Sequence, residues 1–480
     1  MPDQVGDDPS TTGPASRQAV VIGGSIAGLC VAKALTSTFR RVIVFDRDRL
    51  PNETAHRNGV PQGRHVHALL AAGVEAIEEL FTGLRDELAT NGAVAAGLHQ
   101  WRLCFNGHRL APIRERHAPT VLQATRPFFE AHVRERVRAD QSITLIDRCE
   151  VYGLVASPDR RRIVGVRLAD KDDQEQRTVF ADLVVDCSGR RSPLPAWLAE
   201  LGYPSPNVDE LHVDLRYVTR QYRLPPDVLD GDVGVLIGFT PELGRGAGLA
   251  RIEADRWIVT LGGIGGERPP LHTDPFQAYA ATLPIPDAHD AIVRGEPLDE
   301  PAAYRYPSNL RHRYERLDDF PSGLLVAGDA LSSFDPVYGQ GMTVAALEAV
   351  ALRNLLRRDQ APSARRWFAA TEPVVDAAWD IATGGDVATP GVEGHAGLRT
   401  RLTNAYVARL HSAAAQDSTL AERFIRVSNF LDPPRRLLRP GAVARVVRGD
   451  LRRRRHHTTP PRSVTATLGH TTNRRPRHDP

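Results

Sequence analysis

The chain has 480 residues, 41% of them hydrophobic and 25% charged, which is the composition of a globular protein and not of a disordered or fibrous one. Its net charge of +3 gives no general argument for a nucleic acid or a membrane as partner. The four cysteines are scattered, and no apolar run approaches the ~20 residues that span a bilayer, so we expect a cytoplasmic protein without a metal site.

The N-terminal portion of the chain predicts an α/β domain. Residues 1–16 are polar and rich in Pro and Gly, which is typical of a disordered leader. Residues 18–22 (QAVVI) and 41–45 (RVIVF) have the pattern of buried parallel strands joined by a helix. Asn106-Gly107 lies between two β-rich runs and predicts a tight hairpin. Residues 127–139 are expected to form a helix.

The rest of the chain alternates between sheet and helix. Residues 143–186 contain short strands separated by turns, which predicts a β-meander that returns to a buried strand. Residues 205–300 predict an inserted antiparallel sheet. Residues 324–327 form another buried strand, followed by a Gly-rich turn and a helix over 342–358. Residues 361–450 are mostly helical, and the Arg-rich tail beyond them lacks aromatic residues, which favours a solvated tail over a polyanion-binding arm.

A glycine motif, Gly23-Gly24-Ser25-Ile26-Ala27-Gly28, follows the first strand and opens a helix. Gly23 permits a tight turn, Gly28 permits close helix packing, and the free N–H groups of the helix N-terminus suit a pyrophosphate. Ser25 stands where the full pattern has a glycine. Asp46, at the end of the second strand, is placed to bind an adenosine ribose that carries no 2′-phosphate.

A second motif, LLVAGDALSSFDPVYGQGMTVAAL, lies far along the chain. It places Gly328-Asp329 at a strand end, where the aspartate can accept hydrogen bonds from a sugar-alcohol chain. Pro336 and Gly339-Gln340-Gly341 then lead into a helix, and the glycines let the backbone approach a flat ring. Two distant turns of this kind imply one long ligand held by both halves of the chain, and FAD has that shape.

The sequences GGSIAGL and GDALSSFDPVYGQGMTVAALEA resemble the two FAD motifs of the FAD-dependent monooxygenase superfamily, which includes aromatic hydroxylases and squalene epoxidase. The resemblance covers residues 18–450. HRNGVPQGRHVHALL, LVVDCSGRRSPLPAWLAELG and PSNLRHRYERLDDFPSGLLVAGDA resemble a bacterial branch that includes epoxidases of polyether polyketide pathways. The implied fold class is α/β (α+β overall), with a Rossmann-like FAD-binding domain, an inserted antiparallel β-sheet substrate domain and a C-terminal helical region.

This resemblance implies that the FAD-binding domain is assembled from three separate segments of the chain. In chain order the divisions are a disordered leader (1–16), the first FAD-binding segment (17–95), a substrate-domain hairpin (96–115), the second FAD-binding segment with the β-meander (116–200), the substrate domain (201–305), the third FAD-binding segment (306–360), a C-terminal helical region (361–451) and a disordered basic tail (452–480).

The resemblance also implies cofactor contacts. The glycine motif would lie along the pyrophosphate, Arg126 would face FAD, Asp329 would contact its ribityl or pyrophosphate region, and Arg64 would serve the cofactor or the approach of nicotinamide. The full set of expected cofactor-binding residues is Gly23, Gly24, Ser25, Ala27, Gly28, Asp46, Arg47, Arg64, Arg126, Gly328, Asp329, Pro336, Gly339, Gly341 and Met342.

The implied activity is the insertion of one oxygen atom from O2, through a flavin C4a-hydroperoxide, into an electron-rich small molecule. Epoxidation or hydroxylation of a polyketide or another secondary metabolite fits this chemistry. No residue is identified as catalytic, because His56, His65 and His67 are expected to be structural or surface histidines. Three aromatic residues have two alternative locations, the wall of the substrate pocket and the core. They are Tyr217, Phe239 and Trp257.

One departure concerns the reductant. Relatives carry an Asp-Gly motif tied to NAD(P)H, whereas this chain has Ser188-Gly189, with Pro195 in place of an arginine. NAD(P)H is therefore expected to act either directly or through a separate flavin reductase. A flavin-dependent alkene reductase and an inactive paralogue are alternatives. A halogenase is disfavoured, because the WxWxIP motif is absent and neither Lys33 nor Lys171 is well placed.

Overall fold

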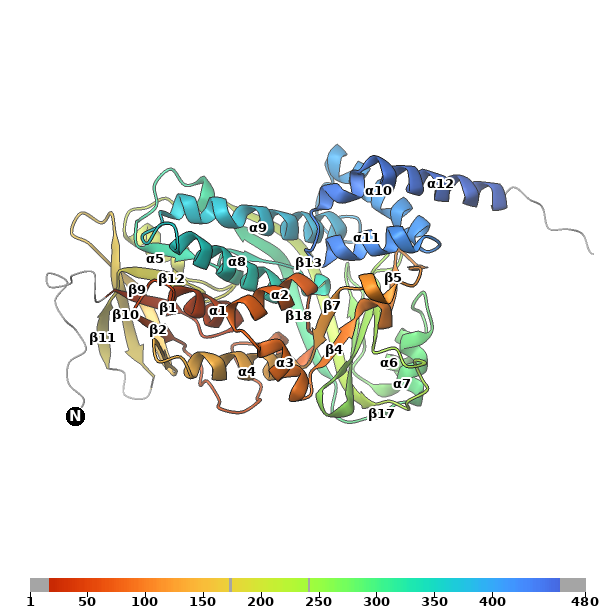
Figure 1. Ribbon diagram of the computed structural model, residues 1–480, viewed down its shortest axis with the longest axis horizontal. Helices are drawn as coiled ribbons and strands as arrows, with labels where there is room; N and C mark the ends of the chain where they lie inside the picture. Colours follow the sequence, from red (N-terminus) through yellow and green to blue (C-terminus); the bar gives the residue numbers. More distant parts are fainter. Residues whose placement is uncertain (1–16, 172–174, 241, 458–480) are drawn as a thin grey trace, which may run out of the picture.

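The structure is a computed structural model that describes residues 17–171, 175–240 and 242–457 (Figure 1). The predicted leader (1–16) and the predicted tail beyond residue 457 lie outside these ranges. Within the described ranges, no helix is long and apolar enough to cross a membrane. The predicted mixed α/β architecture is confirmed, and it is built around two large sheets.

A five-stranded parallel sheet carries both glycine motifs. Its strands lie in the order β19-β12-β1-β2-β8, and β1 pairs in parallel with both β2 and β12. The bounds are β1 (Gln18–Ile22), β2 (Arg41–Phe45), β8 (Ile143–Ile146), β12 (Leu183–Asp186) and β19 (Leu324–Val326). The two central strands are almost wholly buried, as a sheet covered on both faces requires. All five strands therefore end at the same edge, where the glycine turns begin.

Helices cover this sheet in successive layers (Figure 1). Helix α1 packs on β1 and β2, α8 packs on α1, and α9 packs on α8, while α4 packs on α1 and β8. Helices α2 and α5 complete this half of the molecule. The bounds are α1 (Ile26–Leu35), α2 (Ala71–Leu80), α3 (Leu84–Thr90), α4 (Arg126–Arg138), α5 (Leu194–Glu200), α8 (Gly341–Leu356) and α9 (Ala364–Asp386).

The predicted meander forms a separate antiparallel sheet that contacts the parallel sheet through β12. Its strands are β9 (Cys149–Ala156), β10 (Ile163–Asp170) and β11 (Gln176–Phe180). A third small sheet has the order β3-β7-β4, with β3 (Ala68–Leu69), β4 (Val94–Gly97) and β7 (Thr120–Gln123).

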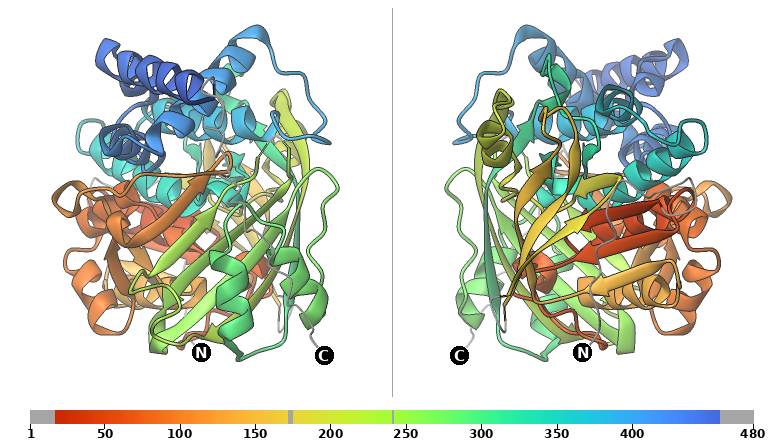
Figure 2. Two further views of the ribbon diagram at one scale, coloured as in Figure 1. Left: turned by 90° about the vertical axis from the view of Figure 1, so that its right-hand side faces the viewer. Right: turned by 90° about the vertical axis from the view of Figure 1, so that its left-hand side faces the viewer.

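The second large sheet has nine strands, in the order β20-β18-β13-β16-β15-β14-β5-β6, with β17 paired to β13 (Figure 2). The expected antiparallel pairing holds except between β14 and β5, which run in parallel; β5 comes from an earlier segment of the chain. The bounds are β5 (Trp101–Phe105), β6 (His108–Arg109), β13 (Val208–Arg223), β14 (Gly234–Ile237), β15 (Arg245–Ile252), β16 (Arg256–Gly263), β17 (Glu296–Pro297), β18 (Ala302–His312) and β20 (Ser332–Ser333).

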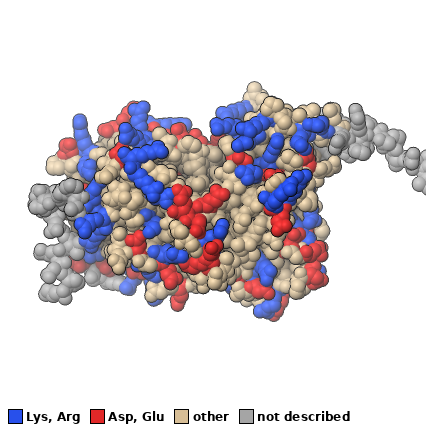
Figure 3. Space-filling view, viewed as in Figure 1, with Lys and Arg blue, Asp and Glu red and all other residues tan. Residues whose placement is uncertain are grey.

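One face of this sheet is covered by α6 (Thr273–Ala280) and α7 (Asp287–Arg294). A second apolar cluster joins the β5–β6 hairpin to the C-terminal helices α10 (Leu398–Ala414), α11 (Ser418–Ser428) and α12 (Pro440–His457). Helix α12 continues beyond residue 452, where the tail is predicted to begin. Figure 3 shows both signs of charge interspersed over one face, with arginines gathered over the C-terminal helices.

Candidate functional site

The first glycine turn joins β1 to α1 in a geometry that side chains would block. Gly23 has φ +101°, and a Cβ atom on it would stand 2.5 Å from the carbonyl oxygen of Cys187. A Cβ atom on Gly28 would stand 1.7 Å from the Gly23 carbonyl oxygen. Ser25 begins α1 without a side-chain cap, so the first N–H groups of the helix remain available to an anionic ligand.

Asp46 ties the end of β2 to this turn. Its Oδ2 accepts a hydrogen bond of 2.7 Å from the Gly24 N–H, and its Oδ1 accepts one of 2.7 Å from the Asp48 N–H. Burial raises the pKa of Asp46, although the positive charge of Arg57 opposes this. Asp46 thus lies at the sheet edge, where an adenosine ribose is predicted. Its neighbour Arg47 is exposed.

Arg126, the first residue of α4, lies between the two glycine motifs. Its Nη2 donates to Ser25 Oγ at 2.9 Å, and it forms an ion pair with Glu130 at 3.5 Å. The charge of Arg126 also acts on Asp329 in the second motif. The atom that makes this ion pair is the buried Nε, 3.5 Å from Glu130 Oε2, and it has no hydrogen-bond partner among the described residues. A buried donor of this kind fits a polar ligand, such as a phosphate or carbonyl oxygen.

Sequence reasoning missed the buried charge cluster that supports Arg126. Glu130 forms an ion pair with Arg57 Nη2 at 2.7 Å and accepts a hydrogen bond from Arg134 Nη1 at 3.1 Å, and all three side chains are at most 5% exposed. Arg57 also approaches Asp46 Oδ2 at 3.5 Å. Buried charges are tolerated when they are mutually paired, which is the case here. The cluster fixes the start of α4 against the first glycine turn.

The second glycine turn lies directly beside the first. Gly328 has φ +64°, and a Cβ atom on it would stand 2.8 Å from the Cβ of Ala27 on α1. Its N–H donates to Glu348 Oε2 on α8 at 2.7 Å, and burial raises the pKa of Glu348 to about 8. Burial also raises the pKa of Asp329, against the charges of Arg126 and Arg190. The two motifs therefore form one site.

The loop from Pro336 to Gly341 leads into α8. Gly339 adopts φ +65°, which favours glycine, and no atom lies within 4 Å of a Cβ placed on Gly341. Helix α8 begins without a side-chain cap, and the buried Oε1 of Gln340 has no partner among the described residues. Met342 is buried in the core. This open helix N-terminus is where the flavin ring is predicted to lie.

A buried acid pair behind this loop was not predicted. Asp386 accepts from Asn309 Nδ2 at 2.6 Å and from the Tyr338 hydroxyl at 2.9 Å. Burial raises the pKa of Asp386 to about 7, and burial beside that carboxyl raises the pKa of Asp335. Oδ2 of Asp335 has no hydrogen-bond partner among the described residues. The pair holds the Pro336–Gly341 loop against α9.

Arg64 and the three histidines singled out in the sequence differ in their exposure and contacts. Arg64 is exposed, although it ends the 3-10 turn η2 (Pro61–Arg64), which packs against Arg126. His56 is also exposed, His65 is buried, and Nδ1 of His67 lies 3.0 Å from the carbonyl oxygen of His65.

The two faces of the nine-stranded sheet separate the three aromatic candidates. Tyr217 and Phe239 share one apolar cluster with Val337 of the Pro336–Gly341 loop, whereas Trp257 packs with α6 and α7. Trp257 is therefore a core residue. Tyr217 and Phe239 face the side of the sheet that carries the cofactor motifs.

The segment that departs from the NAD(P)H-linked motif is used to hold the fold. Arg190 Nη2 donates to Ser308 Oγ at 2.6 Å, and its guanidinium lies over the Tyr306 ring. The Ser188 N–H donates to Asp186 Oδ1 at 2.9 Å, and the Ser192 hydroxyl also bonds to this carboxylate. These bonds tie the segment to β18 and to the end of β12.

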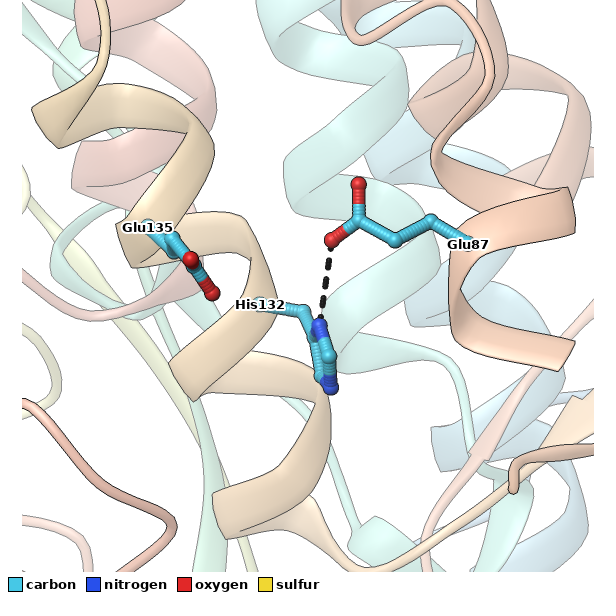
Figure 4. Close-up of side chains that lie close together, drawn as sticks. All are labelled: Glu87, His132 and Glu135. Atoms are coloured by element: carbon cyan, nitrogen blue, oxygen red, sulfur yellow. Dashed lines mark hydrogen bonds and ion pairs between the residues drawn. The ribbon is translucent and has the colours of Figure 1, made fainter. Parts of the chain in front are cut away.

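Glu87, His132 and Glu135 lie close enough to share a cation (Figure 4). His132 Nδ1 is 3.1 Å from Glu87 Oε1, and Arg136 Nε donates to the other Glu87 oxygen at 2.5 Å. Glu87 therefore already has cationic and hydrogen-bonding partners. We interpret the group as a link between α3 and α4.

No protein-family model matches the chain. Protein Rv3254 of Mycobacterium tuberculosis is 33% identical to it, over 86% of this chain and 90% of the relative. Squalene epoxidase 1 of Arabidopsis thaliana is 27% identical, and this match covers 72% of the chain but only 60% of the epoxidase. Kynurenine 3-monooxygenase of Salinispora tropica is 25% identical over 76% of the chain and 78% of the enzyme.

Solved structures share the fold. PqsL of Pseudomonas aeruginosa, described as a probable FAD-dependent monooxygenase, matches with a TM-score of 0.58 and 17% identity, over 78% of this chain and 96% of PqsL. The p-nitrophenol 4-monooxygenase PnpA of Pseudomonas putida DLL-E4 matches with a TM-score of 0.61 and 14% identity, over 86% of this chain and 98% of PnpA. The paired glycine turns, the uncapped helices and these relatives agree, and the chain belongs to the FAD-dependent monooxygenase superfamily.

Proposed function

We propose that this protein inserts one oxygen atom from O2 into an electron-rich small molecule, by epoxidation or hydroxylation. The observation that carries this proposal is the meeting of the two glycine turns at Arg126, whose buried Nε–H donates no hydrogen bond to the described residues. When bound, FAD supplies the redox chemistry and the activation of O2. The chain's own residues hold the cofactor, exclude water and orient the substrate.

The N-terminus of α1, Ser25 and Arg126 would hold the pyrophosphate, because they present N–H groups and positive charge. Asp46 would meet the adenosine ribose, and Asp329 the ribityl chain. The N-terminus of α8 would stabilise negative charge on the reduced flavin ring through its dipole. Tyr217 and Phe239 would contribute to the wall that faces the substrate.

A polyketide or other secondary metabolite as substrate is a further element of this proposal, supported by the resemblance to polyether epoxidases. None of the relatives named above is such an epoxidase, so that resemblance stays a prediction. NAD(P)H would be the source of electrons. The bonds that hold Arg190 and Ser192 in the fold favour delivery through a separate flavin reductase.

The test uses the FAD-loaded protein with an external flavin reductase and a panel of alkenes and phenols under ¹⁸O2. We expect substrate-dependent O2 uptake and a product that carries one labelled oxygen atom. A product that gains two hydrogen atoms and no label would instead identify an alkene reductase. NADPH that reduces the bound FAD rapidly without the reductase would contradict the two-component arrangement alone.

A further inference from the structure

His65 is a buried residue with one unused hydrogen-bonding group. It follows η2, is 2% exposed, and its Nδ1 lies 2.7 Å from Thr219 Oγ1 on β13. The rings of Tyr217 and Tyr304 flank it, with centroids at 5.8 and 5.4 Å. Its other nitrogen, Nε2, is enclosed and has no hydrogen-bond partner among the described residues. Buried polar groups without a partner are rare, so this one requires an explanation.

A chain of hydrogen bonds fixes which nitrogen of His65 carries the hydrogen. The Val66 N–H donates to Thr260 Oγ1 at 3.1 Å, and Thr260 Oγ1 lies 2.6 Å from Thr219 Oγ1. If Thr260 donates to Thr219 and Thr219 donates to His65 Nδ1, both hydroxyl hydrogens have an acceptor within the chain. The opposite direction leaves the Thr260 hydrogen without an acceptor among the described residues. The network therefore places the hydrogen of His65 on Nε2.

The His65 ring also stays neutral. Burial lowers its pKa to about 3, and the nearby His67 and Arg64 act in the same direction. Nε2–H is thus an uncharged donor over the whole physiological range of pH. It can hold an acceptor in place, but it does not release a proton to it.

Apolar side chains cover one side of His65, toward the second glycine motif. Tyr217, Tyr304, Phe239 and Val337 belong to one cluster, and Val337 lies in the loop that leads to α8. A Cβ atom on Gly262 would stand 3.1 Å from the rings of both Phe239 and Tyr217, so these two rings cover the sheet at Gly262. A neutral donor among aromatic walls is the arrangement that orients an apolar ligand by one polar group.

We propose that His65 Nε2–H anchors an acceptor oxygen of the substrate, which is otherwise apolar and carries its reacting alkene or ring elsewhere. The inference rests on the proposed function, because it places the substrate between the nine-stranded sheet and FAD. It narrows the substrate class to molecules with a carbonyl or hydroxyl oxygen. His65 is a substrate-positioning residue, and Thr219 acts through it by fixing its tautomer.

The tautomer is tested by nitrogen NMR of the FAD-loaded protein labelled with ¹⁵N-histidine, with His65→Gln used to assign the signals. We expect a pyridine-like Nδ1 and a pyrrole-like Nε2 for His65, unchanged between about pH 6 and about pH 8. Thr219→Val should remove this preference. A pyrrole-like Nδ1 in the wild type would overturn the proposal whatever the enzyme oxidises.

The anchor is tested with acetophenone and α-methylstyrene, which have the same shape and differ in the acceptor oxygen. Their binding is followed by the change in absorption of the bound FAD. His65→Phe should weaken acetophenone binding by between about twofold and about tenfold, the range of one neutral hydrogen bond, and leave α-methylstyrene unchanged. His65→Gln, whose amide N–H reaches the position of Nε2, should retain most of the acetophenone affinity.

His411→Phe is the matched control. His411 is also buried, and burial lowers its pKa to about 3. Its Nε2 has no hydrogen-bond partner among the described residues, but the ring packs between Phe105 and Phe424 beside the C-terminal helices. This variant should change the binding of neither probe.

Three results would overturn the anchor. Equal losses for both probes in His65→Phe would show that the ring only packs. Failure of both probes to bind the wild type would show that the site does not take such a ligand. A change in FAD affinity or in the ligand-free FAD spectrum of His65→Phe, with probe binding unaffected, would assign the donor to the cofactor. A missing ¹⁸O product concerns the proposed function and leaves the tautomer and probe results unaffected.

Discussion

Glu130→Gln tests whether the buried charge cluster under the first glycine turn is held together by one carboxylate. Glu130 is 3% exposed and lies within 3.1 Å of Arg134 and within 2.7 Å of Arg57. A glutamine of the same shape keeps the volume but removes the negative charge. Two buried guanidinium groups would then lose their closest counter-charge, and their desolvation would no longer be offset.

The magnitude follows from these contacts. Glu130 accepts one hydrogen bond from Arg134, and a hydrogen bond to a charged group contributes about 1.5–3 kcal/mol. Its ion pairs with Arg57 and Arg134 are buried, and breaking a buried ion pair by removing one partner costs about 3–5 kcal/mol. We therefore expect the unfolding free energy of the apoprotein to fall by about 3–5 kcal/mol in Glu130→Gln.

Urea unfolding with and without FAD measures this effect. The stabilisation that FAD adds should be retained, because the lost charge is negative and the predicted ligand group is an anion. Glu135→Gln is the matched control: Glu135 is an exposed glutamate on the same helix, and its substitution should change stability by no more than about 0.5 kcal/mol. Equal stabilities of Glu130→Gln and the wild type would refute the reasoning.

Three further predictions concern the cofactor motifs, a buried acid and Lys33. Asp329→Ala and Gly28→Val should be purified with little FAD, the first because it removes the proposed contact with the cofactor and the second because its Cβ would collide with the turn; full occupancy in both would contradict the proposed cofactor contacts. Burial raises the pKa of Asp386 to about 7, above the ~3.9 of an unfolded chain, so its proton stabilises the fold below about pH 4 and this contribution is lost as the pH rises to 7. Asp386→Asn should therefore flatten the decline of unfolding free energy over that range, and an unchanged slope in urea titrations would argue against it. Lys33→Arg should leave product formation intact, because Lys33 forms an ion pair with Asp140 at 2.8 Å on the far end of α1; chloride-dependent product that disappears in this variant would revive the halogenase alternative.

The elements of the fold that the sequence predicts well are those set by local chemistry. The pattern QAVVI, followed by two glycines and an apolar helix, is sufficient to predict β1, the turn and α1. A buried parallel strand and a positive φ each restrict strongly which residues can occur. Asn106-Gly107 likewise forms the predicted hairpin between β5 and β6. The parallel pairing of β5 with β14 was not predicted, because strand order depends on contacts between distant segments.

The charge cluster shows why the rest of the site could not be predicted. Arg126, Glu130 and Arg134 have the i,i+4 spacing of a helix, and such a row normally indicates a solvated face with pairs worth about 0.3–0.5 kcal/mol. Arg57, which completes the cluster, comes from a loop whose course no local pattern determines. The sequence shows the spacing of these charged residues, but it does not show that they are buried.

The composition of this cluster also constrains how the cofactor is held. The cluster beside the first glycine turn pairs three arginines with three acidic residues, so their formal charges cancel. These residues are Arg57, Arg126, Arg134, Asp46, Asp48 and Glu130. An anionic pyrophosphate bound there would be stabilised by the N–H groups of α1 and by the Nε–H of Arg126, which makes no hydrogen bond to the described residues, more than by long-range positive charge. Directed hydrogen bonds are screened less by salt than long-range attraction. FAD affinity should accordingly depend weakly on ionic strength, and this fits a protein whose overall charge is only +3.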